Sequence, residues 1–165
     1  MAELEVSQVR ELLNKNWMTH DAMWFFHCWQ ECGMATANKL NLAAIDSMAR
    51  IEAGRYARAL GLEQVASLDQ LRRFVQGVFS LAKADFMDFT YELSEDGVLS
   101  MDMGECFAYH GIKRLGVLDQ YQCGIYRRVD AWLDALGLSY EVEPRFDGCL
   151  KLQHGWCRRA YHISF

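Results

Sequence analysis

Apolar side chains recur at helical spacing through most of the first half of the chain. Residues 6–13 predict a short amphipathic helix, which the polar run 14–16 interrupts. A second helix is expected from Thr19, as its N-cap, to about Cys32, where Gly33 is placed to end it. Its side chains are apolar nearly all round, so we expect this helix in the middle of a core.

The helical pattern continues almost to the middle of the chain. Residues 35–60 form the longest periodic stretch, and Gly61 closes it. Ser67 is a favourable N-cap for a fourth helix that runs toward Leu81. The first half is therefore predicted to be helical.

The period changes to two after Asp85, which is typical of strands. Residues 86–93 alternate between apolar and polar side chains, and the sequence Ser-Glu-Asp-Gly at 94–97 predicts a turn. Residues 98–103 can then return as the second strand of a hairpin.

The last third predicts two more helices and two more strands. Helices are expected at 105–115 and 118–136, and closing strands at 140–146 and 157–165. The order of elements predicts an α+β fold, with a four-stranded antiparallel sheet made of two hairpins and helices packed on one face.

Length and composition agree with one domain over residues 1–165, with a helical half at 1–82 and a mixed half at 83–165. Hydrophobic residues make up 52% and charged residues 24%, which is a globular composition. The one proline, Pro144, leaves no room for a Pro-rich linker.

The charge pattern argues against two classes of partner. The formal net charge is −5, with 17 basic and 22 acidic residues and no dense basic run, so nucleic acid is not expected. No apolar stretch is long enough to predict a membrane span. The acidic start lacks the features of a signal peptide, so we expect a cytoplasmic protein with reduced cysteines.

Cysteine and histidine gather in the last sixty residues, where they could hold a metal. Cys149, His154 and Cys157 crowd the last predicted hairpin, and Cys106 lies on an earlier helix. Thiolates and imidazoles at such separations could bind zinc, although no Cys-x2-Cys pair is present. The alternative is a set of inert thiols that pack as small core side chains.

Cys123 is a candidate nucleophile for an enzyme. His110 or His154 could act as its base, and Asp130 on the same helix could orient that base. The alternative is a thiol at a helix edge that touches the sheet, because no motif fixes the base.

Polar residues on apolar faces of the helical half suggest a ligand site. On the third predicted helix, Asn38, Glu52 and Tyr56 fall on the stripe that should be buried. A buried carboxylate needs a partner, and Arg55 on the adjacent row could pair with Glu52. A purely structural ion pair is the alternative to a carboxylate in a cleft.

The second predicted helix contributes a further polar group to this prediction. His20 and Trp24 share a face of it, and Asp21 lies in its first turn. Aromatic walls from Trp17, Trp24, Phe25 and Tyr56, with a few polar groups, are typical of a small-molecule pocket, which we expect between the helical half and the sheet. The same composition is also typical of a core.

Two stretches resemble an uncharacterised family of prokaryotic cytosolic proteins. The matching positions in the first half are Trp17-Met18, Asp21, Trp24-Phe25, Ala37-Asn38, Ile51-Glu52 and Arg55. Those in the second half are Glu105-Cys106, Gly116, Cys123, Trp132, Cys149 and Trp156-Cys157. The chain is also weakly similar to L-2-amino-thiazoline-4-carboxylic acid hydrolase-like proteins. That similarity implies hydrolysis of a C–N or C–S bond in a small cyclic substrate.

These patterns lead to three functional hypotheses. The first is a small-molecule-binding protein, with zinc as a candidate cofactor. The second is the hydrolase that the resemblance implies. The third is a homodimeric interaction module, which an exposed apolar patch on the Trp-rich helix would favour.

Overall fold

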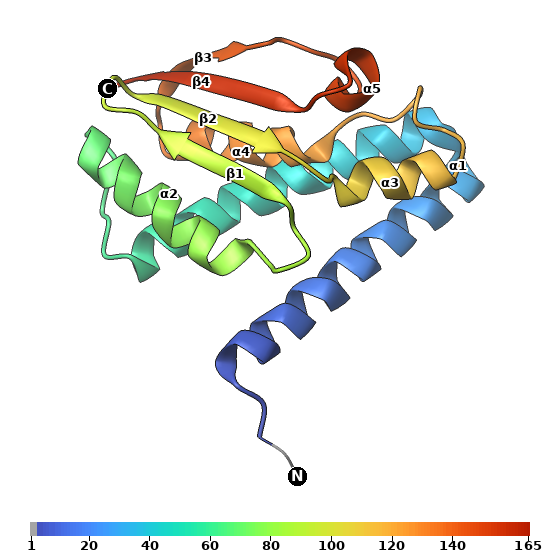
Figure 1. The fold of residues 1–165 in the computed structure, drawn as a ribbon, viewed down its shortest axis with the longest axis horizontal. Coiled ribbons are helices and arrows are strands. Elements are labelled where there is room, and N and C mark those ends of the chain that lie inside the picture. Colours follow the sequence, from blue (N-terminus) through green and yellow to red (C-terminus); the bar gives the residue numbers. More distant parts are fainter. Residues whose placement is uncertain (1–2) are drawn as a thin grey trace.

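The computed structural model describes residues 3–165 and shows an α+β fold (Figure 1). The elements in chain order are α1 (Val6–Ala59), α2 (Leu68–Ala82), β1 (Phe89–Leu93), β2 (Val98–Met103), α3 (Phe107–Arg114), α4 (Gly124–Ala135), β3 (Ser139–Glu143), α5 (Leu150–His154) and β4 (Arg158–Ser164). The four strands form one antiparallel sheet, so the predicted fold class is confirmed.

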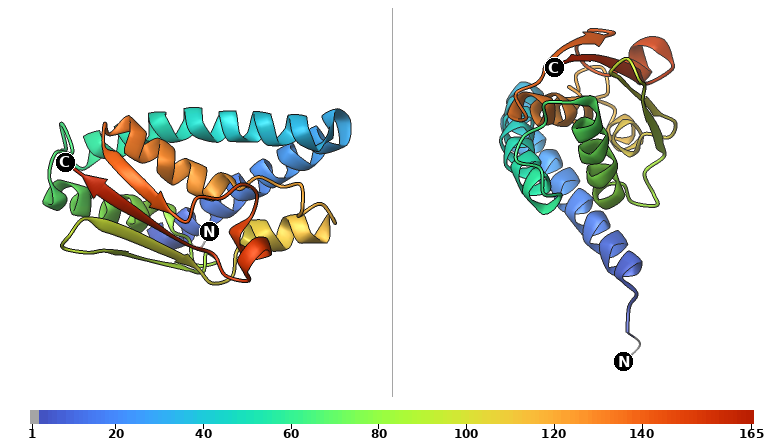
Figure 2. Two further views of the ribbon diagram at one scale, coloured as in Figure 1. Left: turned by 90° about the horizontal axis from the view of Figure 1, so that it is seen from above. Right: turned by 90° about the vertical axis from the view of Figure 1, so that its left-hand side faces the viewer.

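Helix α1 consists of two helical segments that meet at a kink at Gly33, so the predicted helix end at Gly33 is confirmed (Figure 2). Gly33 has φ 78° and ψ 164°, a backbone conformation that favours glycine. The predicted break at 14–16 is wrong, because these residues are helical. Thr19 is no N-cap either, since its hydroxyl donates to the carbonyl of Lys15 at 2.8 Å inside the helix. Three polar residues lower helix propensity by only a few tenths of a kcal/mol each, so packing of the helix outweighs them.

The sheet has the strand order β1-β2-β4-β3. Strands β1 and β2 form the predicted hairpin, with Phe89 opposite Met103 and Leu93 opposite Leu99. Strands β3 and β4 pair as predicted, but the short helix α5 lies between them in the chain, so they do not form a simple hairpin. Helix α4 begins at Gly124 and not at 118, as the pattern predicted.

The helices α2, α4 and the second half of α1 lie on one face of the sheet, and within residues 3–165 the opposite face carries no long helix (Figures 1 and 2). Helix α4 packs most closely on the second half of α1. Gly124 permits this approach, because a side chain there would overlap the end of Ile45. The first half of α1 crosses below this layer and projects from the body (Figure 1).

Two clusters of buried side chains stabilise this arrangement. The larger lies between sheet and helices, where Leu99 and Met101 of β2 meet the buried face of α2 and Trp132 of α4. The smaller surrounds Phe25 and Tyr121 near the bend of α1.

The N-cap of α2 is Ser67, as predicted, and its hydroxyl accepts from the backbone of α2. Within residues 3–165 no helix combines the length and apolar character that a membrane span requires.

Candidate ligand-binding cavity

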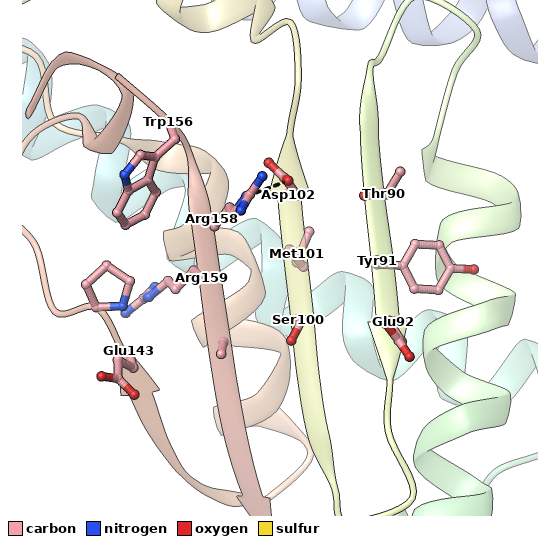
Figure 3. A pocket seen from close by; sticks show the side chains of 12 residues that line it. Thr90, Tyr91, Glu92, Ser100, Met101, Asp102, Glu143, Trp156, Arg158 and Arg159 are labelled. Carbon is pink, nitrogen blue, oxygen red and sulfur yellow. Dashed lines mark hydrogen bonds and ion pairs between the residues drawn. The ribbon is translucent and has the colours of Figure 1, made fainter. Parts of the chain in front are cut away.

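A broad hollow of about 640 Å³ lies on the face of the sheet away from the helices (Figure 3). Two of its charged side chains pair with each other, since Arg158 Nε lies 2.7 Å from Asp102 Oδ2. Arg158 is 71% and Asp102 41% exposed, so this pair is well solvated. Trp156 borders the hollow and stacks on His154. We interpret this hollow as polar surface.

A second cavity, of about 440 Å³, lies between the sheet and the helices. Its volume falls within the range of roughly 300–1,000 Å³ that is usual for small-molecule sites. Six of the eight methionines of the chain line it: Met18, Met23, Met48, Met87, Met101 and Met103. The aromatic lining consists of Trp17, Phe25, Phe26, Phe79, Phe89, Phe107, Tyr121 and Trp132. The cavity is therefore apolar, and methionine lets such walls adapt in shape.

Arg128 is the charged side chain that is fixed most firmly in the wall of this cavity. Its guanidinium lies 4.9 Å from the ring centroid of Trp17 and 5.1 Å from that of Trp132, so two indoles hold it. These cation–π contacts orient the guanidinium and link α1 to α4. The side chain of Arg128 is only 17% exposed.

Glu52 binds the same guanidinium, although Glu52 does not itself line the cavity. Its carboxylate accepts from Arg128 Nε at 2.9 Å and from Nη2 at 2.5 Å, which is a bidentate pair. It also accepts from Trp132 Nε1 at 2.8 Å and from the Tyr56 hydroxyl at 3.0 Å. Burial, followed by the Glu52 charge, raises the pKa of Tyr56 to about 12, so this hydroxyl stays a donor. Four donors thus satisfy one carboxylate.

Asp21 is a second carboxylate on the cavity wall, on the first half of α1. Its side chain is 52% exposed, yet desolvation by its surroundings raises the pKa of this carboxyl. The neighbouring charges of His20 and Arg128 act in the opposite direction. Asp21 therefore lies at the border between the apolar cavity and water.

The predicted ligand residues divide into two groups. Asp21, Glu52 and Tyr56 lie at the cavity wall or directly behind it. Asn38 is buried, but it fixes a loop: its amide donates to the Gln120 carbonyl at 2.7 Å and accepts from the Gln122 backbone at 3.1 Å.

Three other members of the predicted ligand set lie elsewhere. His20 is 77% exposed and Trp24 is 45% exposed, on the outer face of α1. Arg55 is also exposed, and the partner of Glu52 is Arg128 and not Arg55. The predicted Glu52–Arg55 pair is therefore wrong, because Arg55 points away from the packed face.

The predicted catalytic residues are not brought together. Burial raises the pKa of the Cys123 thiol to about 12, so the thiol is protonated near neutral pH and is a poor nucleophile. His110 pairs with Glu105 at 2.5 Å on the surface, and Asp130 pairs with the buried Arg159 at 2.8 Å. Neither of them forms a hydrogen bond with Cys123 in the part of the chain that the structure describes.

The predicted zinc ligands also separate. Cys106, Cys149 and Cys157 are buried, whereas His154 is exposed and its ring stacks on Trp156 at 4.9 Å. Across residues 3–165, no three His, Cys, Asp or Glu side chains are placed to hold a metal ion. The structure therefore does not support the zinc set, and core thiols, the alternative interpretation, describe these cysteines better.

Sequence reasoning placed Trp17 and Phe25 in the pocket wall, where they lie, but missed Arg128 and the methionine lining. A buried carboxylate on α1 signalled that a cation was required, but its partner lies 76 positions away on α4. The number of methionines was a further signal, since the chain has eight in 165 residues.

The fold and the cavity together define an α+β protein in which a bent helix, a second helix layer and an antiparallel sheet enclose an apolar chamber with one anchored arginine. The chain belongs to the family of unknown function DUF6125, whose model matches residues 2–143. That match covers both halves of α1, the first three strands and the residues that anchor Arg128. Comparison with curated proteins and with solved structures found no match.

Proposed function

We propose that this protein binds a small, largely apolar molecule in the cavity between the sheet and the helices. The observation that carries the proposal is a chamber of about 440 Å³ whose walls are methionine and aromatic side chains. Native interiors are close-packed, so an apolar space of this size costs stability unless a ligand occupies it. A polar cluster at one wall, rather than polar groups throughout, is typical of a binding site.

Filling the cavity should abolish binding. Ala108 lines it, and Ala108→Trp places an indole in the space. A neutral fluorophore such as N-phenyl-1-naphthylamine should bind the native protein with an increase in fluorescence. We expect at least a roughly tenfold weaker affinity for Ala108→Trp, because the indole takes up much of the volume.

Ala135→Trp is the matched control, because Ala135 is exposed on α4 and lies outside the cavity. It should bind the fluorophore like the native protein, and thermal melts should show that both variants fold. Equal fluorophore affinity in all three proteins would place the dye elsewhere and contradict the proposal.

A second role, self-association, is supported by the outer face of the first half of α1. Exposed apolar residues there include Val6 at 85% and Leu13 at 64%. With Val9 they recur at alternating spacings of three and four, which is the pattern of a coiled-coil seam. Polar side chains, those of Asn16, His20 and His27, occupy later positions of the same series. We propose a second copy of this chain as the partner, since pairing in register sets each apolar residue against itself. A bilayer surface fits less well, because the charges beside this stripe are mixed and not rich in lysine.

Sedimentation tests this second role. The native protein should sediment as a dimer, and Leu13→Asp should shift it to a monomer by placing a charge in the seam. Leu40→Asp is the control, since Leu40 is also exposed (42%) but lies on the other half of α1. A native monomer, equal effects of both variants, or a native protein that binds phosphatidylcholine vesicles instead would each overturn the homodimer.

A further inference from the structure

We infer that the ligand is an uncharged molecule with an apolar body and one hydrogen-bond-accepting oxygen, as in a ketone, and that Arg128 donates to that oxygen. This inference rests on the proposed function and names the chemical class that the same cavity selects. It follows from the contacts of one guanidinium and from the charges around it.

The free edge of the guanidinium is identified by elimination. The indole rings of Trp17 and Trp132 lie 4.9 and 5.1 Å from it, measured between Cζ and the ring centroids. Glu52 accepts from Nε and Nη2, and no group within residues 3–165 accepts a hydrogen bond from Nη1. Arg128 lines the cavity, whereas Glu52 does not. The Nη1 donors are thus left for water or for a ligand.

The orientation of this donor is fixed before any ligand arrives. Bidentate pairing with Glu52 and two cation–π contacts hold the guanidinium, so little side-chain freedom remains to be lost on binding. A donor that is already oriented favours a ligand whose oxygen lies at one defined position of an apolar skeleton.

The charges nearby disfavour ionic ligands. Arg128 and Glu52 neutralise each other, and the lining adds one further charge of each sign, from Asp21 and from the exposed Arg114. An anion that approached Arg128 would also meet the field of Asp21 and Glu52, while a cation would meet the guanidinium. Desolvating an ion in so apolar a chamber costs further free energy. A neutral acceptor avoids each of these penalties and still pairs with Nη1.

Three probes with one skeleton test the inference: 2-acetylnaphthalene, 2-ethylnaphthalene and 2-naphthoate. They share the ring system and differ in the group that would face Arg128. A hydrogen bond from a charged donor should make the ketone bind roughly tenfold tighter than the hydrocarbon, which corresponds to about 1.4 kcal/mol. Naphthoate should bind most weakly.

Variants of Arg128 assign the preference to this side chain. Arg128→Lys keeps a cation opposite Glu52 but lacks the planar fork, so the preference for ketone over hydrocarbon should fall toward one while hydrocarbon affinity changes little. Glu52→Gln combined with Arg128→Met removes both charges and should give the same result. Arg127→Met is the control, because Arg127 pairs with Asp46 and does not line the cavity.

The outcomes separate this inference from the proposed function. If ketone and hydrocarbon bind the native protein equally, if naphthoate binds tightest, or if Arg128→Lys keeps the full preference, the ligand class is wrong while binding in the cavity stands. If none of the three probes binds the native protein and the neutral fluorophore also fails, the proposed function falls, and this inference falls with it.

Discussion

At the scale of single residues, Glu52 is the side chain on which the polar end of the cavity depends. It is 12% exposed and accepts from Arg128, Trp132 and Tyr56. Removing one partner of a buried pair leaves the other charge without compensation, which costs more than the pair itself contributes. The same carboxylate therefore determines both stability and the position of the cavity's donor.

Glu52→Ala should lower the free energy of unfolding in urea by roughly 3 kcal/mol, because Arg128 and Trp132 lose their acceptor. Glu63→Ala is the control, since Glu63 is exposed in the loop after α1, and its loss should change stability by less than about 0.5 kcal/mol. Adding Arg128→Met to Glu52→Ala should restore part of the loss. Equal midpoints for Glu52→Ala and Glu63→Ala would show that the cluster contributes nothing.

At the scale of elements, sequence patterns predicted the strands and turns that are determined by neighbouring residues. The strand Val98–Met103 and its turn were predicted because alternation and turn chemistry lie within ten neighbouring residues. The helix α5 was missed, because five residues are too few to show a period. The polar run 14–16 was taken for a break, although surrounding packing keeps it helical.

The candidate site was only half predictable for the same reason. The sequence shows that Glu52 falls on a buried stripe and needs a cation, but periodicity cannot say which arginine lies opposite. The answer depends on how α4 packs against α1, which Gly124 and Ile45 determine through close contact. The cavity could not be predicted, because core residues and cavity-lining residues have the same apolar composition in the sequence. Whether a space remains between them depends on how several elements pack.

At the scale of the whole molecule, the four cysteines of the last third are buried or half-buried although they come from separate segments. Cys106, Cys123 and Cys149 stand at the N-caps of α3, α4 and α5, and Cys157 precedes β4. Burial raises the pKa of Cys157 to about 11 and that of Cys106 above its ordinary value. Only the assembled fold brings these segments together, so protection of the thiols reports on the entire domain.

A disulfide reagent such as Ellman's should therefore label the exposed Cys32 first and the half-buried Cys28 next. The buried thiols of Cys106, Cys149 and Cys157 should react only as fast as the protein unfolds. Burial raises the folded pKa of Cys106, Cys123 and Cys157 above the unfolded value of about 8.5. The folded state therefore holds more protons, and stability is lost as pH rises from about 8.5 toward the folded pKa values of about 11 for Cys157 and about 12 for Cys123. Cys123→Ala should reduce this alkaline slope, while Cys32→Ala should leave it unchanged. Rapid labelling of all six thiols in native buffer would contradict this prediction. It would mean that the segments carrying these cysteines open without global unfolding, and that the cavity beside them is not a rigid site.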